Sequence, residues 1–123
     1  MANKKILIVE DDVMLLEMIK IQLGEMGYEA ITAENGKDGL FKAIQERPDL
    51  IIADIMMPEL DGNEMIKLIR QDSNLSKTPV VVVSALGRET DVSTSLQAGA
   101  NDYIIKPFFA ADLEKLLKKH LAA

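Results

Sequence analysis

Residues 48–62 read Pro-Asp-Leu-Ile-Ile-Ala-Asp-Ile-Met-Met-Pro-Glu-Leu-Asp-Gly, and this stretch decides the fold. It contains the apolar run 50–53, with a proline before it and proline and glycine after it. A short, continuous apolar run of this kind is typical of a strand buried on both faces, as in parallel sheets. Parallel sheets bind ligands at the carboxyl ends of their strands, and Asp54 follows this strand directly. From the strand alone, Asp54 is either a solvated strand end or a functional carboxylate.

Composition narrows the class of protein. The 123 residues, 48% of them hydrophobic, are enough for one globular domain with a core. The net charge of −6 disfavours nucleic acid as a direct partner, because phosphate backbones bind to basic surfaces. There is no cysteine, and no apolar stretch approaches the ~18 residues that span a bilayer. With no signal sequence at the N-terminus, we expect residues 1–123 to form a single cytoplasmic domain without membrane contact.

Strand and helix patterns alternate along the rest of the chain. Apolar and β-branched runs predict four further strands, at 6–9, 28–33, 80–83 and 102–105. Apolar residues at helical spacing predict five helices, at 13–26, 36–46, 63–71, 88–98 and 110–120. Five strands alternating with five helices predict an α/β fold, in which helices cover both faces of a parallel sheet.

The same patterns assign single residues to caps and faces. Asp12 is the predicted N-cap of the first helix. Leu40, Ala43 and Ile44 are predicted to face the core from the second helix. His120, the only histidine, is predicted to be solvated on the polar side of the last helix.

Polar side chains follow the ends of four predicted strands, and they are Glu10, Asp11, Asp54, Ser84 and Lys106. Because the carboxyl ends of parallel strands meet at one edge of a sheet, we expect these residues to share one cleft. Clustered carboxylates repel one another unless a cation joins them, and oxygen ligands favour Mg²⁺ or Ca²⁺. With a lysine and a hydroxyl beside them, the site suits a phosphoryl group, and a carboxylate can itself be the nucleophile.

Four motifs carry a resemblance to a known family. They are Ile-Leu-Ile-Val-Glu-Asp-Asp at 6–12, Asp-Ile-Met-Met-Pro-Glu-Leu-Asp-Gly at 54–62, Val-Ser-Ala at 83–85 and Gly-Ala-Asn-Asp-Tyr-Ile-Ile-Lys-Pro-Phe at 99–108. Each is weak alone, but together, in this order, they are specific and cover essentially the whole chain. On these residues the chain resembles the receiver domain of two-component response regulators, in particular the chemotaxis regulators. The resemblance implies a flavodoxin-like, doubly wound sheet of five parallel strands in the order 2-1-3-4-5, with five helices in three layers.

The resemblance also implies a phosphoacceptor and a metal site. Asp54 matches the aspartate that takes a phosphoryl group from the phosphohistidine of a sensor histidine kinase. The cofactor would be Mg²⁺, or Mn²⁺ in its place. Its protein ligands would be Glu10, Asp11, Asp54 and the main-chain carbonyl of Met56, with Glu10 reaching the metal through water.

Further matches concern the phosphoryl contacts and the switch. Ser84 and Lys106 match the hydroxyl and the ammonium group that contact the phosphoryl oxygens. Pro107 matches a proline whose preceding peptide bond is cis in the family. Tyr103 matches an aromatic switch residue, which turns inward as phosphorylation draws the Ser84 hydroxyl toward the phosphate. The surface formed by the last two helices and the last strand would change with it.

By resemblance, the protein is a signalling switch that catalyses only its own phosphorylation and dephosphorylation. Its upstream partner would be a sensor histidine kinase or a phosphotransfer protein, and the expected state is a monomer or weak dimer. The downstream partner would be another protein or an output domain outside this chain. A free-standing regulator, a phosphorelay intermediate and a receiver from a longer protein all remain open.

Other functions fit the residues less well. Phosphatases with an aspartate nucleophile generally carry a second aspartate two residues later, where this chain has Met56. A flavin carrier of this fold would need a phosphate loop after the first strand, where Glu10, Asp11 and Asp12 would repel phosphate. No EF-hand spacing for Ca²⁺ is present. A receiver that works without phosphorylation is disfavoured, since every site position holds a residue that the family accepts.

Met56 and Leu86, each two positions after a site residue, are predicted to flank the phosphoryl group. Both are apolar and fairly large, so we expect them to hinder the attack of water and to prolong the life of the aspartyl phosphate. The variant Met56→Asn should lose its phosphoryl group several-fold faster than the parent, as followed by intact mass after the phosphodonor is removed. Loss at the parent's rate would contradict this prediction.

Overall fold

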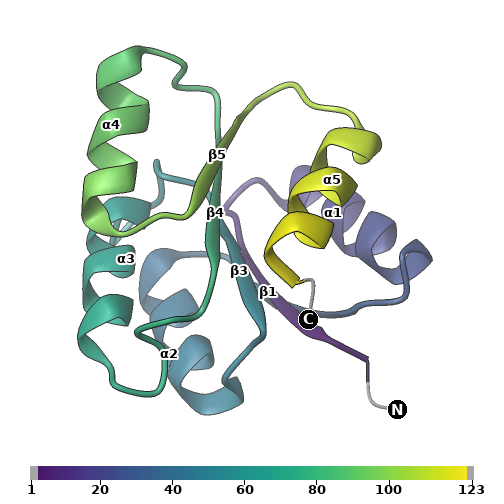
Figure 1. Cartoon of the computed structure of the whole chain (residues 1–123), viewed down its shortest axis with the longest axis horizontal. Coiled ribbons are helices and arrows are strands. Elements are labelled where there is room, and N and C mark those ends of the chain that lie inside the picture. The colour runs from purple at the N-terminus through teal and green to yellow at the C-terminus, as the bar shows by residue number, and fades with distance from the viewer. Residues whose placement is uncertain (1–2, 122–123) are drawn as a thin grey trace.

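The computed structural model describes residues 3–121, in which strands and helices alternate (Figure 1). The strands are β1 (Lys5–Val9), β2 (Glu29–Ala33), β3 (Leu50–Ala53), β4 (Val80–Ser84) and β5 (Asp102–Ile105). The helices are α1 (Val13–Glu25), α2 (Gly36–Glu46), α3 (Gly62–Gln71), α4 (Glu89–Ala98) and α5 (Ala110–Leu121). Every predicted strand and helix is therefore present within the described residues, with its ends close to the predicted ones.

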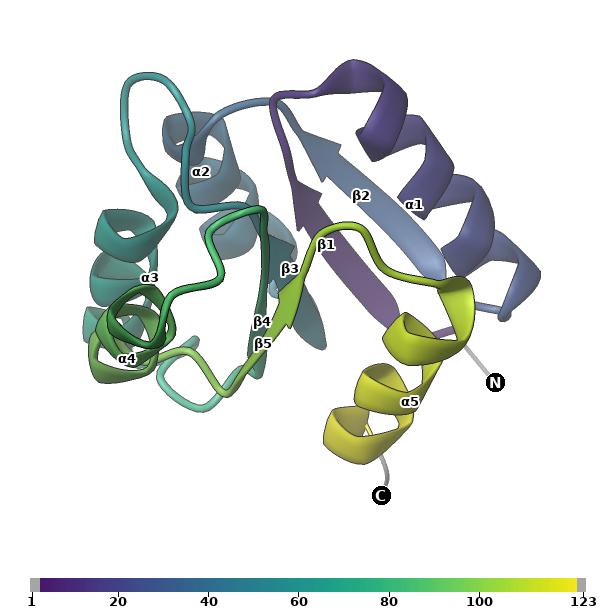
Figure 2. The ribbon, with the colours of Figure 1, turned by 90° about the horizontal axis from the view of Figure 1, so that it is seen from above.

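The five strands form one sheet in the order β2-β1-β3-β4-β5, and every neighbouring pair is parallel. Val9 pairs with Ala53, which pairs in turn with Val82, while Ser84 pairs with Ile105. The predicted flavodoxin-like fold and its strand order are confirmed. Since the strands run the same way, their carboxyl ends meet at one edge of the sheet (Figure 2).

Two helical layers cover the sheet, with α2, α3 and α4 on one face and α1 and α5 on the other (Figure 1). Side chains alternate between these layers along each strand, as the pleat requires. Leu7 and Val9 pack in the core under α2–α4, whereas Ile6 and Ile8 pack in the core under α1 and α5. Because every strand residue of β1 from Ile6 onward is buried, the apolar run in the sequence is continuous and not alternating.

Short polar side chains begin three of the helices. Asp12 caps α1, as predicted, and its Oδ1 accepts hydrogen bonds from the amides of Met14 and Leu15 at 3.0 and 3.3 Å. Asn35 caps α2, and Asp61 caps α3. Each cap satisfies amide groups that have no partner inside the helix, and so the helices start immediately after the carboxyl ends of β1, β2 and the β3 loop.

Glycine allows the loop after β3 to close tightly over the strand end. A Cβ at Gly62 would overlap the carbonyl oxygen of Asp54, and a Cβ at Gly36 would overlap the carbonyl oxygen of Leu60. The Gly62 amide donates to the carbonyl of Ile55 at 2.8 Å. The backbone of Asp54 therefore lies so close to the start of α3 that position 62 has no room for a side chain.

The sequence predicts that Ile44 faces the core, but its side chain is 49% exposed. The buried face of α2 consists instead of Gly36, Gly39 and Ala43. A Cβ at Gly39 would overlap the Val9 side chain, so α2 lies unusually close to β1. This close packing leaves Ile44 at the outer rim of the helix, a position that the apolar spacing does not distinguish from the core.

The prediction that His120 is solvated is also wrong. Its side chain is only 16% exposed, and its Nε2 lies 3.1 Å from Oδ2 of Asp102 at the start of β5. Lys119 Nζ lies 3.2 Å from the same oxygen. Burial by itself raises the pKa of Asp102, but hydrogen bonds from His120, the Tyr103 amide and Lys119 outweigh it and lower that pKa. His120 and Asp102 are eighteen positions apart and lie in different elements, so helical periodicity could not indicate their contact.

Within residues 3–121, no helix combines the length and the apolar character needed to cross a lipid bilayer.

Glycine substitutions in the tight β3 loop and in an open part of α1 should have opposite effects on stability. Gly62→Ala forces a methyl group onto the Asp54 carbonyl, so the free energy of unfolding should fall by about 2 kcal/mol or more. Gly24→Ala is the matched control, because a Cβ at Gly24 in α1 meets no atom within 4 Å. It should raise the stability by roughly 0.5–1 kcal/mol through helix propensity. Urea denaturation measures both, and equal effects would contradict the packing described.

Candidate functional site at the carboxyl edge of the sheet

The carboxyl edge of the sheet brings together two carboxylates and one ammonium group from three strands. Lys106 Nζ, just after β5, lies 2.8 Å from Oε1 of Glu10 and 3.0 Å from Oδ2 of Asp54. Glu10 and Asp54 follow β1 and β3 and are only 3% and 8% exposed. The predicted convergence of these three residues is confirmed. The lysine supplies the positive charge that two neighbouring buried carboxylates require.

The backbone positions both carboxylates. The amide of Asp54 donates to the carbonyl of Val9 at 3.0 Å, which continues the β1–β3 pairing past the strand end. Oδ1 of Asp54 accepts from the Ile55 amide at 2.7 Å, and Oε2 of Glu10 accepts from the Asp12 amide at 3.0 Å. One oxygen of each carboxylate is thus bound by the main chain, while the other faces Lys106.

Burial and neighbouring groups shift the pKa values of Glu10 and Lys106. Burial raises the pKa of Glu10 to about 6, assisted by the nearby charge of Asp54 and opposed by hydrogen bonds from Lys106 and the Asp12 amide. Burial lowers the pKa of Lys106, but its hydrogen bonds to Glu10 and Asp54 outweigh burial and raise it. Near neutral pH the ammonium therefore stays charged, and Glu10 is close to its titration range.

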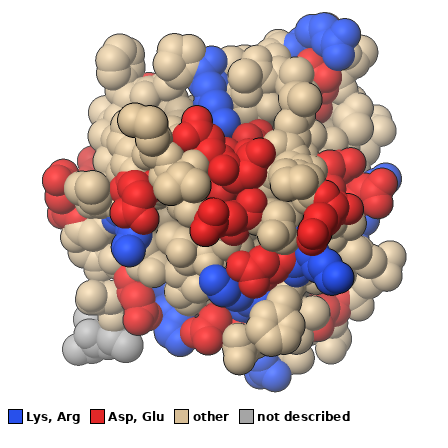
Figure 3. Space-filling model, turned by 180° about the vertical axis from the view of Figure 1, so that it is seen from behind, with Lys and Arg blue, Asp and Glu red and all other residues tan. Residues whose placement is uncertain are grey.

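Asp11 adds a third carboxylate to the site. Glu10, Asp11 and Asp54 each offer an oxygen, and these oxygens all lie within 4.8 Å of one another. Asp11 is exposed, while the other two are buried, so the cluster opens to solvent on the side of Asp11. Three convergent carboxylates are ligands that suit Mg²⁺ or Mn²⁺. On the face opposite to that of Figure 1, Asp and Glu side chains gather near the middle (Figure 3).

Ser84 and Tyr103 are linked through the loop that follows β4. Ser84 is buried, and its hydroxyl oxygen accepts from the Leu86 amide at 3.1 Å. The Tyr103 hydroxyl donates to the carbonyl of Leu86, and its ring packs against the core under α2–α4. The Tyr103 side chain is therefore half-buried, with its hydroxyl bound to the loop after β4. Ser84 and Tyr103 therefore both bind Leu86, Ser84 at its amide and Tyr103 at its carbonyl.

Two hollows border the cluster. One of about 410 Å³ is lined by Lys106 together with Asp12, Leu15, Met18, Ala85, Pro107 and Phe108. The other, of about 380 Å³, is lined by Asp11 together with Ile55, Met56, Met57, Pro58 and Asp61. The Lys106–Pro107 peptide bond is cis, the form that the resemblance implies. The Met56 side chain is exposed beside Asp11, so it borders the entrance and leaves its carbonyl as the candidate ligand.

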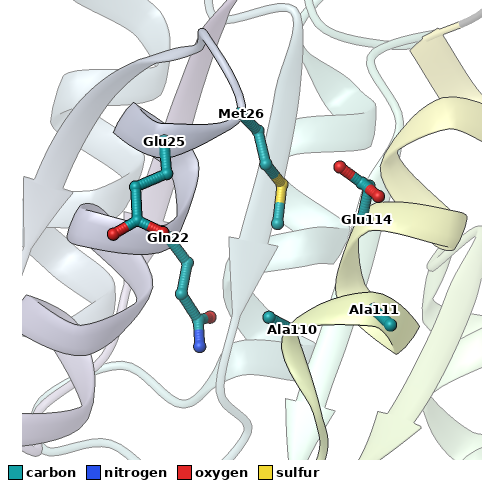
Figure 4. A pocket seen from close by; sticks show the side chains of 6 residues that line it. All are labelled: Gln22, Glu25, Met26, Ala110, Ala111 and Glu114. Carbon is teal, nitrogen blue, oxygen red and sulfur yellow. The ribbon is translucent and has the colours of Figure 1, made fainter.

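A separate hollow of about 340 Å³ lies between α1 and α5 (Figure 4). Its lining residues are Gln22, Glu25, Met26, Ala110, Ala111 and Glu114, none of which belongs to the cluster. The side chains of Gln22 and Glu25 come from α1 and that of Glu114 from α5. It is therefore distinct from the candidate site.

Sequence reasoning missed two features of this region. It did not predict that Glu10 is buried and bonded directly to Lys106. A glutamate directly after a fully apolar strand was the signal that it is buried. It also passed over Arg70, whose guanidinium bonds to two separate loops. Nothing in the spacing of Arg70, in the last turn of a helix, indicated these contacts.

Comparison with known proteins places these residues in context. Residues 6–118 match the family model of the response regulator receiver domain. The chain is 39% identical to the alkaline phosphatase synthesis transcriptional regulatory protein PhoP of Bacillus subtilis, over 94% of this chain and 48% of the relative. It is 36% identical to the phosphate regulon transcriptional regulatory protein PhoB of Pseudomonas aeruginosa, over 96% and 52%. The chain thus spans about half the length of these curated relatives.

Solved structures are similar along nearly the whole chain. The receiver domain of the sensor histidine kinase PA1611 from Pseudomonas aeruginosa is 32% identical, with a TM-score of 0.93 and coverage of 99% of this chain and 100% of that one. That structure has a magnesium ion coordinated in its active-site cleft. The chemotaxis protein CheY4 of Vibrio cholerae is also 32% identical, with a TM-score of 0.93 and coverage of 98% and 100%.

The arrangement around Lys106 predicts a metal-dependent effect on stability. Lys106→Met leaves Glu10 and Asp54 without their cation, so the free energy of unfolding at pH 7 should fall by about 2 kcal/mol. Mg²⁺ should stabilise this variant more than it stabilises the parent, because a bound cation replaces the lost ammonium charge. Urea denaturation with and without MgCl₂ measures this difference.

Lys119→Met is the control, since Lys119 is an exposed lysine that pairs with Asp102 away from the cluster. It should change the stability by less than ~1 kcal/mol and leave the response to Mg²⁺ unaltered. An equal gain from Mg²⁺ in all three proteins would contradict the role given to Lys106.

Proposed function

The chain belongs to the response regulator receiver domain family, the switch domains of two-component signalling, and on this premise we propose that Asp54 is its phosphoacceptor. Residues 1–123 would form one receiver domain that takes its phosphoryl group from the phosphohistidine of a sensor histidine kinase or a phosphotransfer protein. The observation that carries this assignment is the triad of Glu10, Asp54 and Lys106 at the carboxyl edge of the sheet.

Asp54 has the surroundings that a phosphoacceptor needs. Its Oδ1 is bound by the Ile55 amide, while its Oδ2 is held by an ammonium group alone. In the proposed transfer, a carboxylate oxygen of Asp54 attacks the phosphorus atom as the P–N bond to the donor imidazole breaks. The imidazole leaves with the electron pair, and the aspartyl phosphate forms. Lys106 then turns its charge from the carboxylate to a phosphoryl oxygen, and the Ser84 hydroxyl binds another.

Glu10, Asp11, Asp54 and the Met56 carbonyl would hold Mg²⁺, or Mn²⁺ in its place. The carboxylate oxygens of Glu10, Asp11 and Asp54 lie within 4.8 Å of one another, which supports these three as ligands. The metal, when bound, neutralises negative charge on the carboxylates and the phosphoryl oxygens. The shared positive charge explains how an acidic cleft can accept a phosphoryl dianion. The same site would release the phosphoryl group to water, so the protein would catalyse its own dephosphorylation as well.

Ser84 and Tyr103 would convert phosphorylation into a change of surface. The Ser84 hydroxyl now accepts from the Leu86 amide, and it would leave this bond to donate to the phosphoryl group. The loop after β4, which Tyr103 also binds, would follow. The surface of α4, β5 and α5 would then present a different shape to a downstream protein or an output domain. We expect a cytoplasmic monomer or weak dimer, acting through proteins and not through nucleic acid or membrane.

The test of the phosphoacceptor is the variant Asp54→Asn. After incubation with acetyl phosphate and Mg²⁺, the parent should gain the mass of one phosphoryl group, and the variant should gain none, because an amide cannot form the acyl phosphate. Asp61→Asn is the matched control in the same loop, since asparagine caps α3 as well as aspartate does. It should be labelled like the parent. Labelling of Asp54→Asn, or no labelling of the parent, would overturn the proposal.

A further inference from the structure

Arg70, in the last turn of α3, binds both the loop that follows this helix and the turn between α4 and β5, which begins 29 residues further along the chain. Its Nε and Nη2 donate to the carbonyl oxygen of Gly99 at 3.0 and 2.8 Å, and Nη2 also donates to Oδ1 of Asn101 at 2.8 Å. Its Nη1 donates to the carbonyl oxygens of Leu75 and Thr78 at 3.1 and 2.7 Å. We call this set of bonds the Arg70 clamp. Only a planar guanidinium carries enough donors, in fixed directions, to make it.

The clamp fastens the turn between α4 and β5 to the body of the domain. Oδ1 of Asn101 also accepts from the amide of Val80, the first residue of β4, at 2.8 Å. Gly99 ends α4 with a φ of 122°, and a Cβ there would overlap Cγ of Arg70. The C-terminal end of α4 is therefore joined at once to the end of α3 and to the start of β4.

A second contact strengthens the same end of α4. Ser95 is completely buried, and its hydroxyl donates to Oδ1 of Asn63 in α3 at 2.8 Å. Ala98, in the last turn, is buried in the core under α2–α4. From Ser95 to Asn101, this segment is thus fixed by α3 through side chains that take no part in the candidate phosphorylation site.

The N-terminal end of α4 is held quite differently. Arg88, its capping residue, has a side chain that is 79% exposed and pairs only within its own turn, with Asp91. The bonds that tie this end to the sheet pass through Leu86, from the Ser84 hydroxyl and the Tyr103 hydroxyl. These are the two side chains whose contacts would change on phosphorylation.

From this contrast we infer that the Arg70 clamp makes the C-terminal end of α4 the fixed pivot of the switch, so that phosphorylation moves the N-terminal end of α4 and leaves Ser95–Asn101 in place. The inference rests on the proposed function, because it describes what the aspartyl phosphate does to α4. Without the clamp, the C-terminal end of α4 would be held by the contacts of Ser95 and Ala98, and the loss of bonds at Leu86 would then reach both ends of the helix.

Hydrogen exchange of the backbone amides, read by mass spectrometry, tests the pivot. The parent is compared with and without acetyl phosphate and Mg²⁺. Phosphorylation should change the exchange of residues 86–92 at least about threefold and that of 95–101 by less than about twofold. In Arg70→Met, phosphorylation should change both segments at least about threefold. Arg88→Met is the matched control, because it removes one arginine from the mobile end, and it should keep the parent's pattern at 95–101.

A second pair of variants perturbs the clamp from its other side. Asn101→Ala removes the acceptor that binds Arg70 and Val80, and it should behave like Arg70→Met. Asn101→Asp keeps an oxygen at that position and should restore the parent's pattern. If Arg70→Met does not fold, as judged by circular dichroism, this pair carries the test.

The outcomes separate the pivot from its alternatives. A clamp that serves stability alone would raise the exchange of 95–101 by the same factor with and without phosphorylation, and this result would overturn the inference. So would equal responses at both ends of α4 in the phosphorylated parent. Intact mass of the same samples shows whether phosphorylation occurred. No phosphoryl adduct on the parent would overturn the proposed function itself, whereas an adduct with the wrong exchange pattern would overturn only the pivot.

Discussion

The ammonium group of Lys106, placed between Glu10 and Asp54, is the interaction on which the rest of this structure depends. Lys106 lies 96 positions after Glu10 and 52 positions after Asp54 in the chain. The three groups therefore meet only if β1, β3 and β5 run in the same direction. Two carboxylates that are nearly buried would otherwise repel each other or take up protons. The fold thus places two carboxylates close together at the carboxyl edge of the sheet, and the positive charge of one lysine compensates their repulsion. The ammonium group thus lies at the edge of the sheet where we propose that a metal and a phosphoryl group bind.

The packing around the site explains why its geometry is well defined. Several close approaches involve glycine, including those of Gly62 to the Asp54 backbone and of Gly39 to Val9. The helices that flank β1 and β3 begin at capping residues directly after the strand ends or their loops. Main-chain amides therefore bind one oxygen of each buried carboxylate. The two buried carboxylates are thus held by the main chain, whereas the lysine between them is on a long, flexible side chain.

The two ends of α4 have opposite characters, and this difference links the site to the surface. Near Leu86 the chain is held by the hydroxyl groups of Ser84 and Tyr103, the two residues that we propose respond to phosphorylation. Near Gly99 it depends on the guanidinium of Arg70 and on a buried serine. A helix that is fixed at one end, and held at the other only by hydrogen bonds that can break, can convert a small shift of a hydroxyl into a larger displacement. Polar side chains contribute to this difference, together with the burial of Ala98 in the core.

The sequence by itself determined the alternation of strands and helices, the parallel sheet and the residues at its carboxyl edge. β1, β3 and β4 are mostly continuous apolar runs, and the polar site residues lie at or just after strand ends, so local patterns were sufficient. Tertiary structure alone decided the direct bond between Glu10 and Lys106, the pairing of His120 with Asp102 and the contacts of Arg70. It also decided that Ile44 lies outside, because the approach of α2 to β1 depends on glycines that carry no hydrophobic signal. These features join groups far apart in the chain, and periodicity reports only on neighbours.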